Sequence, residues 1–147
     1  MKSKEDFIFP IGVAAKMLDI SAHTIRLYER SGLILLKKNE AGHRMLSQWD
    51  IDRLECIRKM IVEEKLNIEG IRKLLALRPC WLMFKECTKE VYESCPAYLS
   101  TSGPCWAMEN RPQPCADKDC YYCPIYREPF YCTEIKKTIT KYMKEKS

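Results

Sequence analysis

The sequence predicts a mainly α-helical protein, and two observations support this prediction. Apolar residues recur at helical spacing in several short segments between residues 11 and 77. Residues 80–128, by contrast, hold seven cysteines, five prolines and one glycine with little periodicity, which is typical of an irregular module. We therefore expect a helical domain over residues 1–78, a cysteine-rich module over residues 79–128 and an amphipathic helix over residues 129–147.

The composition narrows the class of protein. The chain has 147 residues and a formal net charge of +5, with fifteen basic against eleven acidic residues in positions 1–78. A mildly basic N-terminal half permits nucleic-acid binding without requiring it. The sequence contains no Ser/His/Asp grouping, phosphate-binding glycine loop or paired carboxylates, so we do not expect an enzyme.

The expected location follows from the same composition. The first residues, MKSKEDFIFP, lack the apolar region of a signal peptide, and no apolar run approaches the roughly 18 residues of a membrane span. We expect a cytoplasmic protein that does not enter a membrane, in a compartment where thiols stay reduced. Nine cysteines in such a protein favour metal or redox chemistry over a disulfide framework. Cys56, which stands apart from the others, is expected to be a small packed residue.

The N-terminal domain is expected to begin with two short helices. Ile11, Ala14 and Leu18 mark the first, and Ser21 is a good N-cap for the second. The second helix should stop at Ser31-Gly32, where glycine suits a helix C-terminus.

A hairpin and two further helices should follow. Extended segments over residues 33–38 and 43–46 flank Asn39-Glu40-Ala41-Gly42, which is typical of a turn. Ser47 and Asp50 form a capping box for a longer helix with Ile51, Leu54, Ile57 and Ile61 on its apolar face. Asn67 can cap one more helix, with Ile68, Ile71, Leu74 and Leu75 on its apolar face.

The helix over residues 22–30 carries an unusual outer face. At about 100° per residue, Ala22 and Ile25 face inward. The outward face holds His23, Thr24, Leu27 and Arg30, with Arg26 and Tyr28 on the flanks. Bidentate donors on an exposed helix suit base edges and phosphates in the major groove, and two helices joined by a short turn are the helix-turn-helix geometry. The alternative is a solvated face on a small bundle. The basic hairpin favours the first interpretation, because it suits a wing that contacts the phosphate backbone.

These segments resemble the MerR family of winged helix-turn-helix regulators. The family pattern T-x-R-x-Y-E-x-x-G-L corresponds to residues 24–33, and its wing pattern corresponds to Gly42-His43-Arg44 with Ser47 and Asp50. The resemblance covers residues 8–77, and the LNIEGI segment is most similar to the heat-shock repressor (HspR-like) branch. The chain has Leu27-Tyr28 where many members have two tyrosines, so a base preference does not carry over.

The resemblance implies a homodimer that binds palindromic promoter DNA and acts on RNA polymerase indirectly. It also implies a set of DNA contacts in the second helix and the wing: His23, Thr24, Arg26, Tyr28, Lys37, Lys38 and Arg44. The family's long dimerisation helix is replaced here by cysteines. We hypothesise that the helix starting at Pro129 makes the dimer, because it has one apolar stripe.

The cysteine module contains an imperfect duplication of the pattern CW…C…CPxY. Copy 1 runs from Cys80-Trp81 to Cys95-Pro96-Ala97-Tyr98, and copy 2 from Cys105-Trp106 to Cys123-Pro124-Ile125-Tyr126. The pattern is similar to the two-CW cysteine module of some bacterial sensory proteins. A segment of about fifty residues with few aliphatic side chains has too little core to fold alone, so a bound metal is expected to stabilise it.

The residues leave three possibilities for the ligand. Cysteine followed by proline is familiar from iron–sulfur ligation, and aromatic neighbours could screen a cluster, so an iron–sulfur cluster is favoured. Zinc in a small aromatic core is the second possibility, and disulfides or a thiol switch the third. The candidate ligands are Cys80, Cys87, Cys95, Cys105, Cys115, Cys120 and Cys123.

These expectations lead to a DNA-binding regulator whose module senses redox or metal status through its bound centre. One alternative is an HspR-like repressor in which zinc is only structural. Another is a redox or electron-carrier protein whose N-terminal domain docks on a partner.

Overall fold

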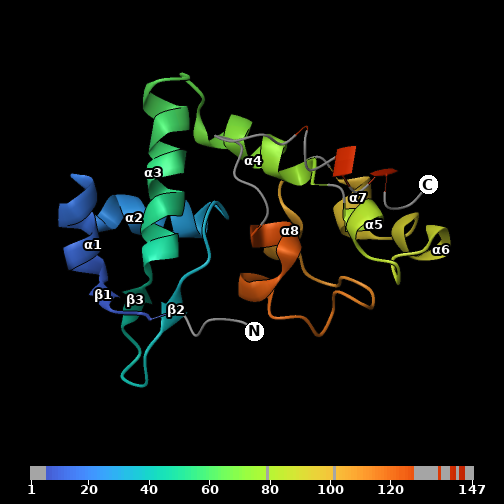
Figure 1. Ribbon diagram of the computed structural model, residues 1–147, viewed down its shortest axis with the longest axis horizontal. Coiled ribbons are helices and arrows are strands. Elements are labelled where there is room, and N and C mark those ends of the chain that lie inside the picture. The colour runs from blue at the N-terminus through green and yellow to red at the C-terminus, as the bar shows by residue number, and fades with distance from the viewer. Residues whose placement is uncertain are drawn as a thin grey trace. The chain divides into compact units, whose positions relative to one another are not determined.

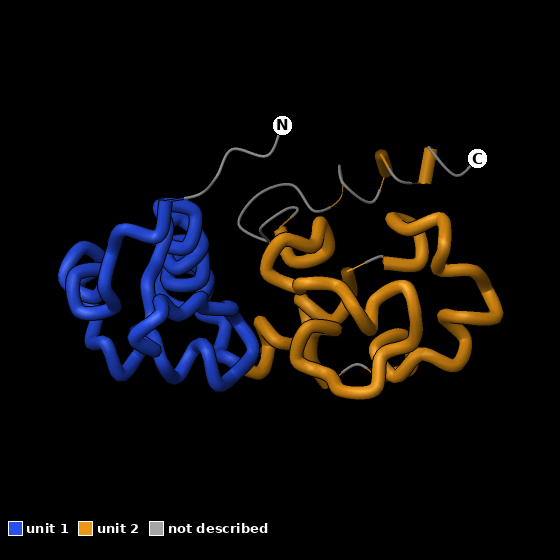
Figure 2. The backbone as a smooth tube through the Cα atoms, turned by 90° about the horizontal axis from the view of Figure 1, so that it is seen from below, with its two compact units in different colours: residues 1–68 blue, residues 69–147 orange. Residues whose placement is uncertain are grey.

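The chain forms two compact units, residues 1–68 and 69–147, in a computed structural model (Figure 2). The structure describes residues 6–78, 80–100 and 102–127, together with positions 136, 140, 141, 143 and 144.

The first unit begins with the two short helices that the sequence predicted. Helix α1 spans Ile11–Leu18 and ends at Asp19, whose backbone is left-handed at φ 54°. Helix α2 spans Ala22–Arg30, and its N-cap Ser21 accepts a hydrogen bond from the Thr24 backbone N–H at 3.0 Å. Gly32 follows the end of α2 at φ 78°, a conformation that glycine adopts without strain. The predicted cap and stop of this helix are confirmed.

A small antiparallel sheet lies beside these helices, in the order β1-β3-β2. Strand β1 is Phe9–Pro10, β2 is Lys37–Lys38 and β3 is Arg44–Leu46. The turn between β2 and β3 is closed by Asn39, which accepts the Gly42 N–H on its carbonyl and the His43 N–H on its side chain. The hairpin is therefore confirmed, with strands shorter than predicted. Strand β1 was not predicted.

Helix α3, Gln48–Val62, is the longest helix of the described chain and begins at the predicted capping box. Asp50 accepts the Ser47 backbone N–H at 2.9 Å, and the Asp50 N–H donates to Ser47 Oγ at 3.2 Å. The turn of the β2–β3 hairpin projects beyond this end of α3 (Figure 1). The core of the unit combines residues from α1, α2, the hairpin and α3: Ala14, Leu18, Ile25, Leu33, Ile34, Leu46, Ile51, Leu54 and Ile57. Cys56 is also buried, but it is disulfide-bonded, so the expectation of a simply packed thiol is wrong.

The second unit starts with helix α4, Ile68–Ala76, which buries Ile71 and Leu75. The sequence analysis placed this helix in the N-terminal domain. In the structure α4 also contacts the cysteine-rich segment: Arg72 Nη2 donates to the Ser102 carbonyl at 3.4 Å and lies against Gly103. The boundary between the units consequently falls after residue 68.

The rest of the second unit is a chain of single helical turns. They are α5 (Cys80–Met83), α6 (Lys89–Tyr92), α7 (Pro96–Leu99), η1 (Cys105–Ala107), η2 (Cys120–Tyr122) and α8 (Pro124–Arg127). The helix predicted over residues 129–147 lies largely outside the described residues. Within the described part of the chain, no helix has both the length and the apolar character needed to cross a bilayer.

Candidate functional site

Helix α2 presents a polar outer face built from three of the residues predicted to contact DNA. His23 and Arg26 are exposed, and Thr24 is half-buried because its hydroxyl shares a 2.8 Å hydrogen bond with the N-cap Ser21. Tyr28 lies on the inner side with 6% of its surface exposed. The exposed pair provides an imidazole and a guanidinium, which are groups that can donate to base edges or phosphates.

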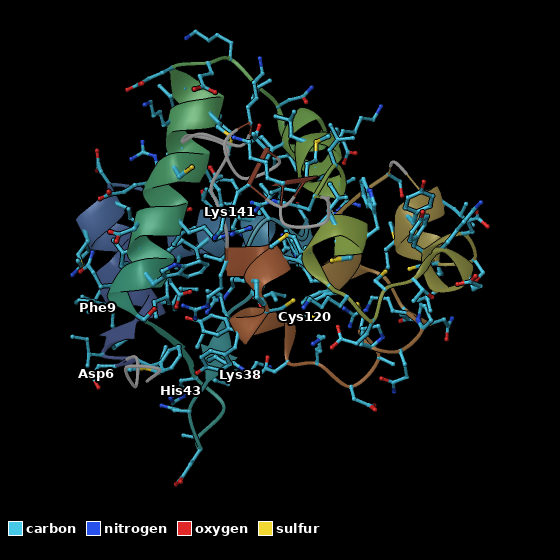
Figure 3. All side chains as sticks on the ribbon, turned by 45° about the vertical axis from the view of Figure 1, so that its right-hand side comes forward. Asp6, Phe9, Lys38, His43, Cys120 and Lys141 are labelled. Atoms are coloured by element: carbon cyan, nitrogen blue, oxygen red, sulfur yellow. The ribbon has the colours of Figure 1, made fainter. Side chains whose placement is uncertain are left out.

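The β2–β3 hairpin carries the predicted wing residues. Lys38 and His43 are exposed on it (Figure 3), and Lys37 is half-buried. Arg44 is also half-buried, because its Nε forms an ion pair with Glu29 Oε2 of helix α2 at 2.5 Å. This ion pair, which the sequence analysis did not anticipate, ties the wing to the outer helix.

In the second unit, the sequence duplication is also a structural one. Trp81 meets Tyr98 edge-on at 5.3 Å in copy 1, and Trp106 meets Tyr126 edge-on at 5.0 Å in copy 2. The proline of each CPxY motif opens a helical turn, α7 or α8. The two copies therefore share the ring contact and the helical turn, although tryptophan and tyrosine are 17 positions apart in copy 1 and 20 in copy 2.

The duplication places the cysteines in matching positions. Cys87 and Cys115 each lie eight residues before the cysteine of their CPxY motif, so they correspond to each other. By the same alignment, Cys120 of copy 2 corresponds to Tyr92 of copy 1. Each copy thus supplies three equivalent cysteines, and copy 2 supplies a fourth.

All the predicted ligand cysteines meet at a single cavity of the second unit, which we call the thiol cavity. Its lining also contains Trp106, Ile125, Tyr126, Arg111 and Lys118. The cysteines in its wall are thiols in the structure: Cys80, Cys87, Cys95, Cys105, Cys115, Cys120 and Cys123. Residues more than forty positions apart in the sequence are thereby brought to one place.

The surroundings of the cavity favour the protonated form of four of its thiols. Burial, followed by the neighbouring Cys87, Cys115 and Cys95, raises the pKa of Cys80 to about 12. Burial raises the pKa of Cys105, Cys115 and Cys123 in the same direction, with contributions from other cysteines of the cavity. Because each thiolate would raise the pKa of the next, the group can hold several negative charges only if a cation compensates them.

One cation is already in place. Arg111 Nη1 donates a hydrogen bond to Cys120 Sγ at 2.9 Å, and the residue lies in the segment between the CW and CPxY motifs of copy 2. Sequence reasoning missed Arg111, because a single arginine in an irregular loop carries no periodic or spacing signal. Its position became evident only once the chain was folded around the cysteines.

The donor set fits a thiophilic metal or an iron–sulfur cluster. The cavity wall contains cysteine sulfur but no histidine and no carboxylate, so it lacks the charged oxygen ligands that calcium and magnesium prefer. Over the described residues, no three cysteine, histidine or acidic side chains are close enough to hold one ion. The sulfurs thus surround a space rather than converge on a point.

The fold of the first unit defines a class of protein. Two helices joined by a short turn, the second with a polar outer face, and a following basic hairpin make a winged helix-turn-helix, the architecture of DNA-binding regulators. The chain belongs to the MerR helix-turn-helix family of regulatory proteins, whose sequence model matches residues 9–77. The family match ends before the first cysteine of the module.

Relatives of the chain are transcriptional regulators. The HTH-type transcriptional regulator GlnR of Bacillus anthracis is 32% identical over 87 residues, which cover 57% of this chain and 67% of the relative. The mercuric resistance operon regulatory protein of Bacillus cereus is 41% identical over 70 residues, or 47% of this chain and 52% of the relative. A heat shock protein HspR of Streptomyces coelicolor is 29% identical over 70 residues, or 48% and 46%.

Proposed function

We propose that this regulator binds promoter DNA through α2 and the hairpin wing, and reports redox or metal status through a centre bound in the thiol cavity. The observation that carries the proposal is the seven-cysteine wall of one cavity in the same chain as a MerR-family domain. An iron–sulfur cluster is the favoured centre, and zinc is the alternative.

The DNA-binding half of the proposal rests on exposed donors. His23 and Arg26 on α2 are placed to donate to the major groove, and Lys38 on the wing can contact the adjacent phosphate backbone. Thr24, Tyr28, Lys37 and Arg44 remain predicted contacts. We further propose that a homodimer binds a palindromic operator and thereby influences RNA polymerase. Truncation before Pro129 should then give a monomer by light scattering if the C-terminal segment makes the dimer.

The sensing half rests on the position of Cys80. This residue follows helix α4 closely in the chain, and a cavity at the C-terminal end of α4 is lined by Leu75, Arg78, Cys80 and Cys105. Two of the candidate ligands therefore border both the thiol cavity and α4. Gain, loss or oxidation of the centre would move these thiols and bias the position of α4, which provides a two-state element for coupling.

A structural zinc site is the second candidate, and the composition of the module favours it. The module's described buried residues are mainly aromatic rings and cysteines, with few aliphatic side chains, so any thiolate-bound metal would stabilise its fold. In this alternative, the regulator responds to a protein partner or to heat. Family membership leaves the proposed electron carrier without support, because a winged helix-turn-helix is a DNA-binding domain.

Anaerobic purification followed by absorption spectroscopy and metal analysis separates these possibilities. A brown protein containing iron and sulfide supports the iron–sulfur centre, whereas a colourless protein containing zinc supports the structural alternative. Operator affinity should then be measured with the centre loaded, removed and oxidised, at fixed salt. We expect a change of roughly 5–150-fold between states, the usual range of allosteric coupling. Equal affinity in all three states contradicts sensing.

A further inference from the structure

The cysteine count of copy 1 limits how the duplicated module can bind a metal. Copy 1 contains only Cys80, Cys87 and Cys95, whereas a four-coordinate thiolate site requires four ligands. If copy 1 takes part in binding, it must therefore share its site with copy 2. Copy 2 alone has four cysteines, so a centre confined to copy 2 is the competing arrangement.

The fold mixes the cysteines of the two copies. All three copy 1 cysteines line the same cavity as those of copy 2. The remaining cysteines of the wall belong to copy 2: Cys105, Cys115, Cys120 and Cys123. The wall of the cavity therefore combines sulfurs from both copies.

The arrangement of the sulfurs favours a cluster over a single ion. A single zinc ion draws its four sulfurs to about 2.3 Å from the metal. Among the described residues, no three cysteine, histidine or acidic side chains are close enough to hold one ion, although seven cysteines line one cavity. Sulfurs that stand around such a space suit a core of several iron and sulfide ions.

The charged side chains of the cavity wall also favour a cluster. A cluster with four cysteine thiolates carries net negative charge, which hydrogen bonds and nearby cations stabilise. Arg111 donates to Cys120 Sγ at 2.9 Å. Lys118 also lines the cavity, and no carboxylate does.

We propose that the two copies bind one iron–sulfur cluster between them, with thiolate ligands from both copies in the thiol cavity. This inference rests on the proposed function, because it locates the centre that the regulator would use. It predicts a single cluster per chain, which disappears as a whole when the cysteines of either copy are removed.

Cysteine footprinting on the full wild-type chain tests the arrangement without any substitution. The protein is reconstituted anaerobically with ferrous iron and sulfide, and its alkylation by iodoacetamide is compared before and after the iron is removed with a chelator. Mass spectrometry then identifies each modified cysteine. A shared cluster should slow alkylation at least tenfold at cysteines of both copies, with at least one among Cys80, Cys87 and Cys95.

A pair of variants provides the second measurement. The copy 1 variant carries Cys80→Ser, Cys87→Ser and Cys95→Ser, and its matched partner carries Cys105→Ser, Cys115→Ser and Cys123→Ser. Both should lose the visible absorbance and the bound iron completely. Full iron retention in the copy 1 variant overturns the shared cluster, as does footprint protection confined to copy 2.

The outcomes separate the two proposals. If the wild-type chain binds iron but protects copy 2 alone, only the shared arrangement fails. If the chain binds zinc and no iron after anaerobic reconstitution, the cluster is excluded and the structural alternative stands. If it binds neither, the proposed sensing function fails with it.

Discussion

Helix α2 divides its side chains sharply between a buried and an exposed side. Ile25 is fully buried and Tyr28 is 6% exposed, whereas His23 and Arg26 are exposed. Burial also raises the pKa of Tyr28. The helix is thus anchored by two large residues and can present its donors on a fixed surface, which is what recognition of base edges requires.

Replacing Arg26 tests this surface directly. Arg26→Ala should weaken operator binding by about 1–3 kcal/mol if the guanidinium donates to a base, and Arg26→Lys should recover only part of the loss because lysine cannot bind a base edge as a planar fork. Fluorescence anisotropy with operator and random DNA measures the effect. Lys59→Ala on α3 is the control, since it removes the same charge from an exposed position. Unchanged affinity in Arg26→Ala contradicts the interface.

Arg111 gives a second prediction at the scale of one residue. In the loaded protein, Arg111→Gln should lower the midpoint potential of the cluster, because a cationic donor to a ligand sulfur stabilises the more negative, reduced state. Arg111→Lys should shift the potential less. A redox titration followed by visible absorbance measures the change, with Lys85→Gln, at an exposed position of the module, as the charge control. Equal potentials in Arg111→Gln and the control would show that Arg111 does not act on the centre.

The positions of individual residues in the structure show what helical spacing can and cannot predict. Spacing placed Ile25 inside and His23 outside, as the structure has them. It placed Tyr28 on the flank of the helix, where the angle alone did not reveal that its ring is buried. Arg44 was expected to face the DNA, but its pairing with Glu29 depends on how the hairpin folds back on α2, which spacing within one element does not contain.

At the scale of elements, the ion pair between Glu29 and Arg44 fixes the wing to the recognition helix. Glu29→Gln should destabilise the first unit by about 1 kcal/mol or less, since both side chains are partly exposed at 22% and 29%. Chemical denaturation measures the loss, and a double-mutant cycle with Arg44→Gln isolates the coupling. Glu40→Gln, in the exposed hairpin turn, makes the same charge change away from the pair. A coupling energy of zero would mean that the contact does not hold the elements together.

The buried thiol of Cys80 predicts that the stability of the second unit depends on pH. In the metal-free protein, burial and the neighbouring cysteines raise the pKa of Cys80 from 9.0 to about 12, so the folded state holds this proton more tightly than the unfolded chain. The stability that Cys80 contributes is therefore complete below pH 9.0 and is lost as the pH rises to about 12.

Urea denaturation of the metal-free protein at about pH 8 and about pH 10.5 should show a weaker second unit at the higher pH. Metal affinity should change in the opposite direction and increase with pH, because each ligand thiol releases its proton on binding. Constant stability across this interval contradicts the buried, protonated state of the thiols.

Elements with a strong local signal were predicted well. The caps at Ser21 and Ser47 and the turn at Gly42 are short-range patterns, and the structure confirms them. Strand β1 is only two residues long and exists because Phe9 pairs with Leu46, a contact that no local pattern encodes. Helix α4 was predicted as a helix, but its assignment to the second unit depends on contacts such as Arg72 with Ser102.

At the scale of the whole molecule, the two units differ in what holds them together. The first unit has an aliphatic core from several helices, whereas the described core of the second contains Trp106, Tyr121 and Tyr126 beside the cysteines. The first unit should therefore fold without a ligand, and the second should depend on its centre.

This difference predicts two thermal transitions in the loaded protein. Removing the metal with a chelator should lower or abolish the transition of the second unit and leave that of the first within about 1 kcal/mol of its original stability. Calorimetry, with circular dichroism as a second probe, distinguishes the two. The stability of the first unit, measured without operator DNA, serves as the internal control. If instead the protein shows a single transition, and removal of the metal shifts it as a whole, the two units unfold together.

The sequence predicted the first unit more specifically than the second. The family, the helical class and the winged helix-turn-helix followed from motifs within residues 8–77, where spacing alone is specific. In the module, seven candidate ligands could be named from the sequence but not grouped, because grouping depends on long-range packing. The common cavity is a product of the fold, which brings cysteines of both copies into one wall.

The matching ring contacts in the two copies have a consequence for ancestry. A half-module with three thiols could not saturate a four-coordinate centre, so its unfused ancestor would have needed a second identical chain to complete the site. Tandem duplication would then have joined two partners that already met around one centre. The cysteine at position 120, where the other half keeps Tyr92, would be the substitution that ended the equivalence of the halves.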